Sequence, residues 1–196
     1  MKIDNKSSGN TRFSGKSSVR SLLRAATFGL AALVVTACSS VPLIGDKEEE
    51  KALLCPSASI LGNAERVVQF KQGSGRDLTD VMFQAEIGKL NMTCRYLKGR
   101  VVTDISFELI AEIGPAAASR IGDFDYFVAI SDSNGRVLAK ETFRSQIAFA
   151  ENRRRAGILE EIEQSIPLRK NEDGGGYEIL IGFQLTKTQL DFNRRQ

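Results

Sequence analysis

The sequence predicts an all-β domain over residues 55–196, built as an antiparallel two-sheet sandwich that ends in a short helix. Apolar and polar residues alternate with period two over several short stretches, which is the pattern of half-buried strands. Turn residues separate these stretches at near-regular spacing. The chain has 196 residues, of which 42% are hydrophobic and 26% charged, and this is an ordinary globular composition for about one domain.

The clearest alternation lies in residues 81–87 and 105–113. In the first stretch Phe83, Ala85 and Ile87 share one face, and Gln84 separates two of them. Because successive side chains of a strand point to opposite sides, one face of each stretch is predicted to enter the core. The inward positions of the second stretch are Ile105, Phe107, Leu109, Ala111 and Ile113.

A hairpin is predicted after residues 126–130, where the sequence reads Asp132-Ser-Asn-Gly135. Asn-Gly is the strongest short hairpin signal, because both central positions of such a turn need a positive φ. A strand should therefore begin at Arg136. Another strand is predicted over 177–185, after the glycine-rich loop 171–176.

Three further segments complete the predicted sheets, residues 57–69, 91–97 and 158–168. In the last segment isoleucines recur at every fourth position, which also fits a helix, so both readings stay open there. Seven to nine short strands with regular turns are typical of an immunoglobulin or fibronectin-III-like β-sandwich. The chain has no Trp, so this likeness is one of architecture only.

A short C-terminal helix is predicted to begin after Thr186. The side chain of Thr186 can cap the helix, and Gln189 three residues later completes a capping box. Leu185 and Leu190 are placed to form a hydrophobic staple across the first turn. We expect this helix to pack on the end of the sandwich.

The first 37 residues have the order of a secretory signal. A basic stretch to Arg24 is followed by an apolar run over 25–37, which is too short for a bilayer core that takes roughly 20 residues. Val35-Thr36-Ala37-Cys38 resembles the lipobox of bacterial lipoprotein precursors, with Thr36 where Ala or Ser is commoner. The alternatives are an ordinary cleaved signal with a chance cysteine, or a buried apolar helix.

The lipobox resemblance implies cleavage before Cys38 and lipid attachment to its thiol and new amine. Residues 1–37 would then be the signal peptide, 38–54 a lipidated tether and 55–196 a single domain. Several acyl chains give a durable anchor where one is marginal. In enterobacterial lipoproteins Asp after the cysteine favours the inner membrane, so Ser39 favours a periplasm-facing position on the outer membrane.

Cys55 and Cys94 remain when Cys38 carries lipid. An even pair of cysteines in an oxidising compartment predicts a disulfide. Two buried free thiols and a catalytic thiol are the alternatives. Cys55-Pro56 and Gly182-Phe-Gln-Leu-Thr186 give the domain a general likeness to small bacterial envelope lipoproteins without an assigned activity, and this resemblance implies a location but no chemistry.

Charge and composition exclude several functions. Six of the 27 basic residues but only one of the 24 acidic residues lie in 1–37, which leaves 38–196 at a net charge of −2. This balance does not suggest a nucleic-acid binder. The chain has no His, which removes Ser-His-Asp and Cys-His catalysis and His-ligated zinc. The sequence predicts no cofactor, no metal and no small-molecule substrate.

Several carboxylates are candidates for functional groups. Asp123, Asp125 and Asp132 could supply oxygen ligands for calcium, but they lack EF-hand spacing and are better explained by turns. Glu108 and Glu112 share the outward face of their predicted strand, where a solvated role is the simpler interpretation, because a glycosidase needs two acids converging in a cleft.

Arg153, Arg154 and Arg155 form the one concentrated charge of the domain. They could contact an acidic partner or anionic head groups, or they could belong to a solvated loop. Ile110 and Leu180 face outward on their predicted strands and indicate a sheet face that is partly covered.

Two functions follow from these observations. The first is a lipid-anchored, non-enzymatic envelope protein that binds a protein partner as an adaptor or structural module. The alternative is a histidine-free hydrolase of cell-wall or glycan material that uses carboxylates. The missing catalytic inventory favours the first.

Overall fold

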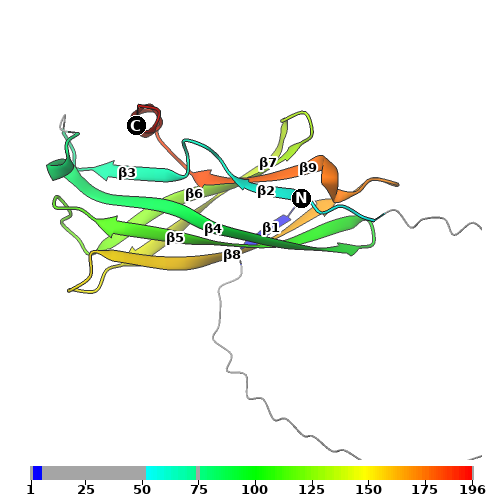
Figure 1. Ribbon diagram of the computed structural model, residues 1–196, viewed down its shortest axis with the longest axis horizontal. Helices are drawn as coiled ribbons and strands as arrows, with labels where there is room; N and C mark the ends of the chain where they lie inside the picture. Colours follow the sequence, from blue (N-terminus) through cyan, green and yellow to red (C-terminus); the bar gives the residue numbers. More distant parts are fainter. Residues whose placement is uncertain (1, 6–51, 74–75, 196) are drawn as a thin grey trace, which may run out of the picture. The chain divides into compact units, whose positions relative to one another are not determined.

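Two β-sheets stack on each other in the computed structural model, which describes residues 2–5, 52–73 and 76–195 (Figure 1). The described residues confirm the predicted all-β, two-sheet architecture. Sheet A has five strands in the spatial order β1, β8, β5, β4 and β3. Their bounds are Lys2–Asn5, Arg155–Pro167, Arg100–Ile113, Val81–Leu97 and Arg66–Phe70.

Sheet B has four strands in the order β2, β9, β6 and β7. All neighbouring strands of both sheets are antiparallel except β2 and β9, which run parallel. Two short 3-10 turns precede β4 and β9. The bounds of the strands and turns are Ser57–Ile60, Tyr177–Phe183, Ile121–Asp132, Val137–Ala148, Leu78–Asp80 and Gly174–Gly176.

The core lies between the inward faces of the two sheets. The predicted inward residues of β5 are all buried there, and Phe107, Leu109 and Ala111 are fully inaccessible. Aromatic rings join the layers, since Phe107 of sheet A meets Tyr126 of sheet B edge-on at 5.3 Å between centroids. Burial of large apolar side chains at alternate positions explains why period two dominates the sequence.

Two predicted segments are divided or joined differently in the structure. Residues 57–69 do not form one strand, because the chain leaves sheet B after β2 and enters sheet A at β3, with Asn63 at φ 63° in the crossing. Residues 81–97 form one long strand, β4, because the chain passes through an irregularity between Gly88 and Asn91 without leaving the sheet.

The predicted hairpin forms between β6 and β7, but its turn differs in detail. Gly135 has φ 75°, whereas Asn134 is not among the residues with positive φ. The Asp132 carboxylate instead accepts hydrogen bonds from the backbone N–H groups of Asn134 and Arg136, both at 3.0 Å. The side chain therefore organises this turn. Residues 158–168, for which the sequence allows either a strand or a helix, lie mostly in strand β8.

The predicted capping box is present at the start of helix α1, Lys187–Asn193. The helix packs beside β3, the last strand of sheet A, where Phe192 and Phe70 meet at 5.3 Å. Two side-chain amides of the helix donate hydrogen bonds to backbone carbonyls at and just before β3. Gln189 Nε2 donates to the carbonyl of Val68 at 3.4 Å, and Asn193 Nδ2 donates to the carbonyls of Asn63 and Arg66 at 2.9 and 2.8 Å.

The opposite edge of sheet A is the strand pair β1 and β8. Strand β1 belongs to the same compact unit as residues 53–196, although most of the chain between them lies outside the described residues. It pairs with only four of the 13 residues of β8, Ile162 to Ser165. The predicted apolar run 25–37, the lipidation residue Cys38 and the tether residues 39–51 also lie outside the described residues.

Candidate functional site

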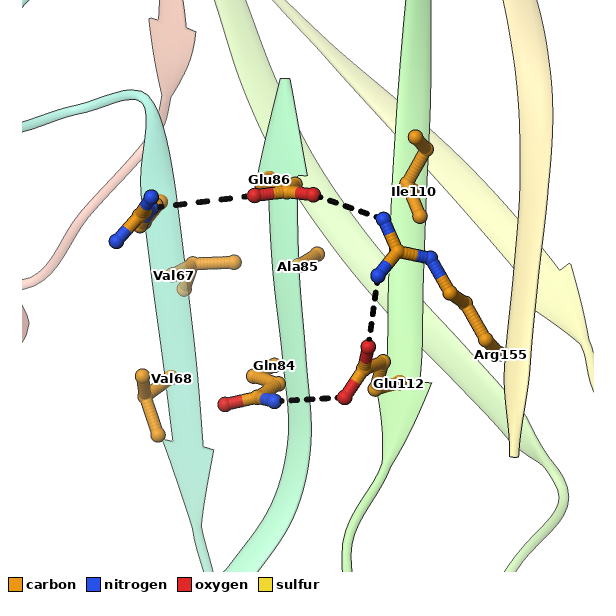
Figure 2. A pocket seen from close by; sticks show the side chains of 9 residues that line it. Val67, Val68, Gln84, Ala85, Glu86, Ile110, Glu112 and Arg155 are labelled. Atoms are coloured by element: carbon orange, nitrogen blue, oxygen red, sulfur yellow. Dashed lines mark hydrogen bonds and ion pairs between the residues drawn. The ribbon is translucent and has the colours of Figure 1, made fainter. Parts of the chain in front are cut away.

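The outward face of sheet A carries a shallow groove of about 260 Å³ that crosses strands β3, β4, β5 and β8 (Figure 2). Strand alternation places polar side chains along this face and leaves Ile110 among them. Figure 2 shows Arg155 reaching from β8 across β5 toward Glu86 and Glu112. The groove is lined by Arg66, Val67, Val68, Gln84, Ala85, Glu86, Ile110, Glu112 and Arg155.

Ion pairs neutralise the acids of this groove. The Arg155 guanidinium donates to Glu86 at 3.0 Å and to Glu112 at 2.9 Å, and Arg66 lies 4.0 Å from Glu86. Gln84 donates to the second oxygen of Glu112 at 3.0 Å. These side chains remain 41% exposed or more, so the pairs are solvent-screened contacts rather than a desolvated reaction centre.

The three predicted arginines do not act as one patch. Arg155 belongs to the groove, whereas the Arg154 guanidinium donates to the carbonyl of Ile113 at 3.0 Å. Arg153 stays in the exposed turn before β8, and its backbone carbonyl accepts from Arg120 at 2.7 Å. The run therefore divides into a groove residue, a residue that secures the β5 end, and an exposed residue.

The predicted carboxylates lie on the sheet surfaces. Glu108 and Glu112 share the outward face of β5, and Lys89 pairs with Glu108 at 2.8 Å. In sheet B, Arg144 donates to both oxygens of Asp125 at 2.7 and 3.0 Å, which holds the pKa of that carboxyl below its ordinary value. The described part of the chain contains no cluster of three or more residues suited to hold a metal ion.

A second shallow depression, of about 270 Å³, lies farther along the outward face over β4, β5 and β8. Three of its lining residues are acidic, namely Asp104, Glu161 and Glu163. Arg95 donates to Asp104 and to Glu163, the latter at 2.7 Å. Arg95 thus bonds two of the three carboxylates, and Glu161 adds a further negative charge beside the β8 edge.

Sequence reasoning missed a buried polar contact that joins the two sheets. The Tyr126 hydroxyl donates to Glu160 at 2.9 Å, and Ser145 donates to the other oxygen of the same carboxylate. Burial and the neighbouring carboxylate raise the pKa of the Tyr126 phenol far above its ordinary value. The phenol therefore keeps its proton and serves as a hydrogen-bond donor between the layers.

Gln164 is a second polar residue in the core that was not singled out from the sequence. Its side chain is fully buried on β8, and neither its Nε2 nor its Oε1 has a hydrogen-bond partner. Thr103, its cross-strand neighbour on β5, also has a buried hydroxyl without a partner. The signal was present in the sequence as a polar residue between Ile162 and Ile166, at an inward position of the strand.

The predicted disulfide joins Cys55 to Cys94, with 5.9 Å between the Cα atoms. It ties the entrance of the domain to strand β4. Tyr96 reinforces the same place, because its hydroxyl donates to the carbonyl of Leu54 at 2.5 Å and accepts from the N–H of Gly174 at 2.6 Å. The chain is thus fixed at the residue where the predicted tether ends.

Among the described residues there is no helix long and apolar enough to cross a membrane. Comparison with known proteins adds no assignment to this geometry. No protein-family model, no curated protein and no solved structure matches the chain.

Proposed function

We propose that the protein is a lipid-anchored lipoprotein of the outer membrane that faces the periplasm. We propose further that it acts as a non-enzymatic binding module. The lipobox-like sequence ending at Cys38 supports the anchor, and Ser39 supports the outer membrane. The Cys55–Cys94 disulfide supports an oxidising compartment.

The observation that carries the binding role is the pairing of acids with Arg155 on the outward face of sheet A. Glu86 and Glu112 each bond the same guanidinium, so both carboxylates are engaged in structural contacts. Hydrolysis by paired acids instead requires two carboxyl groups that converge on a substrate in a cleft. Ile110 lies in the same groove and offers a partner an apolar contact among paired charges.

We also infer that the sandwich is related in architecture to immunoglobulin and fibronectin-III domains. Strands β5 and β8 are neighbours in sheet A, while β6 and β7, which lie between them in the sequence, form a hairpin in sheet B. A fourth strand that returns beside the first is the crossover of Greek-key sandwiches and supports this relation. Such modules commonly bind through an exposed sheet face or strand edge.

The anchor is tested by mass spectrometry of the N-terminal peptide from the protein expressed in a bacterial host, with Cys38→Ala as the control. We expect a triacyl mass on Cys38 and recovery with the outer-membrane fraction. The control should retain residues 1–37 and lack the lipid. An unmodified Cys38 in the processed protein would disprove the anchor.

The binding role is tested by a photo-crosslinking residue at position 110, in the groove, and at position 137 on β7 as the matched control. Val137 is 56% exposed and lies on the other sheet. We expect a reproducible adduct from position 110 that depends on Cys38. Equal adducts from both positions, or release of soluble fragments from purified cell wall by the protein, would contradict a binding module.

A further inference from the structure

The two edges of sheet A are occupied in different ways. At β3, the side chains of Gln189 and Asn193 bond the carbonyls of Asn63, Arg66 and Val68, and the helix that carries them follows directly from β9. At β8, a strand from the extreme N-terminus is hydrogen-bonded to residues 162–165. The proposed processing before Cys38 would remove that strand and expose the β8 backbone at residues 162–165.

The register of β1 places this strand over a buried amide that has no partner. Asp4 is paired with Glu163 in that register. Ile3 stands opposite Gln164, whose buried amide has no hydrogen-bond partner. A polar group left unpaired in the interior is unfavourable, so a strand that supplied a partner at this position would bind better.

We propose that the β8 edge of the processed protein binds an extended basic segment of another envelope protein by antiparallel strand addition. Backbone bonds of the incoming strand replace those of β1. Lys or Arg opposite Glu161 and Glu163 supplies charge complementarity, and a hydroxyl or amide side chain opposite Gln164 satisfies the buried amide. The inference rests on the proposed function, because residues 162–165 lose the pairing with β1 only after processing.

Charge identifies the occupant as a basic partner. Glu161 makes no ion pair with any described residue, and Glu163 shares Arg95 with Asp104. A second copy of the same edge would oppose Glu161 to Glu163 when the two-fold axis passes through Ile162. When the axis passes through residue 163, the Glu163 side chains of the two copies would oppose each other. Residues 161–163 of β8 therefore favour a strand of opposite charge over self-pairing.

The proposal is tested with synthetic peptides on the processed lipoprotein purified in detergent. The complementary peptide carries Lys-Thr-Lys-Val-Lys, which places Thr opposite Gln164 and Lys opposite Glu163 and Glu161 in the register of β1. A scrambled peptide of the same composition and a peptide with the native sequence of residues 2–5 are the comparisons. Fluorescence anisotropy gives the affinity, and hydrogen exchange locates the protected amides.

We expect the complementary peptide to bind most tightly and to protect amides of β8 while leaving β3 unchanged. Glu161→Lys should weaken its binding by about fivefold, the upper range for one cross-strand charge pair. The same variant should improve binding of a Glu-Thr-Glu-Val-Glu peptide. Glu141→Lys, an exposed charge change on β7, is the matched control and should leave both affinities unchanged.

The contribution of the buried amide is tested separately. Replacing Thr by Val in the peptide should weaken binding to the natural protein, and this preference should vanish in Gln164→Leu. Absence of β8 protection with every peptide, or an equal loss of binding in Glu161→Lys and Glu141→Lys, would overturn the proposal. A triacylated Cys38 without strand binding would reject this inference alone, whereas an unlipidated Cys38 would reject the proposed anchor.

Discussion

The edges at β3 and β8 belong to the same sheet but are protected by different means. At β3 the cover is the helix α1, which remains attached after any N-terminal processing and bonds three carbonyls through two amide side chains. At β8 the cover is β1, a four-residue strand from the predicted signal peptide. Unpaired strand edges invite pairing with other chains, so proteins cover those that must stay inert. Under the proposed processing, the edge at β3 keeps its cover and the edge at β8 loses the strand that is paired with it.

The largest expected effect is that of removing the disulfide, which should destabilise both edges. Cys94→Ser removes the bond to Cys55, which closes a loop with a sequence separation of 39. Because the unfolded chain then gains conformational entropy, the free energy of unfolding should fall by about 4 kcal/mol. Denaturant titration measures the loss, and hydrogen exchange should accelerate at β3 and β8 together. Acceleration at one edge alone would show that the disulfide acts locally.

The next effect separates the edges. A precursor blocked at Cys38→Ala retains β1, whereas the processed protein lacks it. Loss of the backbone bonds to β1 should raise hydrogen exchange at residues 162–165 by about tenfold, since one or two such bonds are worth about 1.4 kcal/mol. Amides of β3 serve as the internal control and should not change. Equal exchange in both proteins would mean that β1 does not protect this edge.

A smaller effect is expected at the closed edge. Asn193→Ala removes the donor to the carbonyls of Asn63 and Arg66, which should lower the free energy of unfolding by about 1–2 kcal/mol. The denaturant midpoint should fall with an unchanged slope. Lys187→Ala, at the other end of the same helix, is the matched control. If both variants behave alike, the amide bonds do not secure the edge.

The smallest effect should leave both edges of sheet A untouched. Arg144 lowers the pKa of Asp125 in sheet B, so the stabilisation from this carboxylate is present above its unfolded pKa of about 3.9. It is lost as the pH falls through the lower pKa of the folded state. Asp125→Asn should therefore be less stable at pH 7, and its difference from the natural protein should shrink below pH 4 in thermal melts. A difference that stays constant with pH would contradict this assignment.

Much of the fold could be predicted because period two directly reports which side of a strand is buried. The inward series of β5 from Ile105 to Ile113 was assigned correctly for this reason. The same signal could not decide residues 158–168, because a spacing of four residues is even and also close to one helical turn. It could not show the crossing between β2 and β3 either, where a single residue, Asn63, takes a positive φ.

The candidate sites were harder to predict because their contacts are distant in sequence. Arg155 and Glu86 are 69 residues apart and lie on strands separated by β5, so no local spacing reveals their pairing. The pairing of β1 with β8 is equally non-local. Gln164 could have been noticed, since it interrupts an apolar series at an inward position, but its lack of a partner is visible only in three dimensions.

The fixed entrance of the domain also has a mechanical consequence. In the proposed role, the protein is held to a membrane at one end and to a partner at the other, and it would carry tension along its chain. Strand β2 alone would yield to a pull at Leu54 by peeling from β9, because the two share only four paired positions. The Cys55–Cys94 bond instead transfers the load to β4, whose long pairing with β5 must be sheared. The domain is thereby built to stay folded while its anchor is pulled.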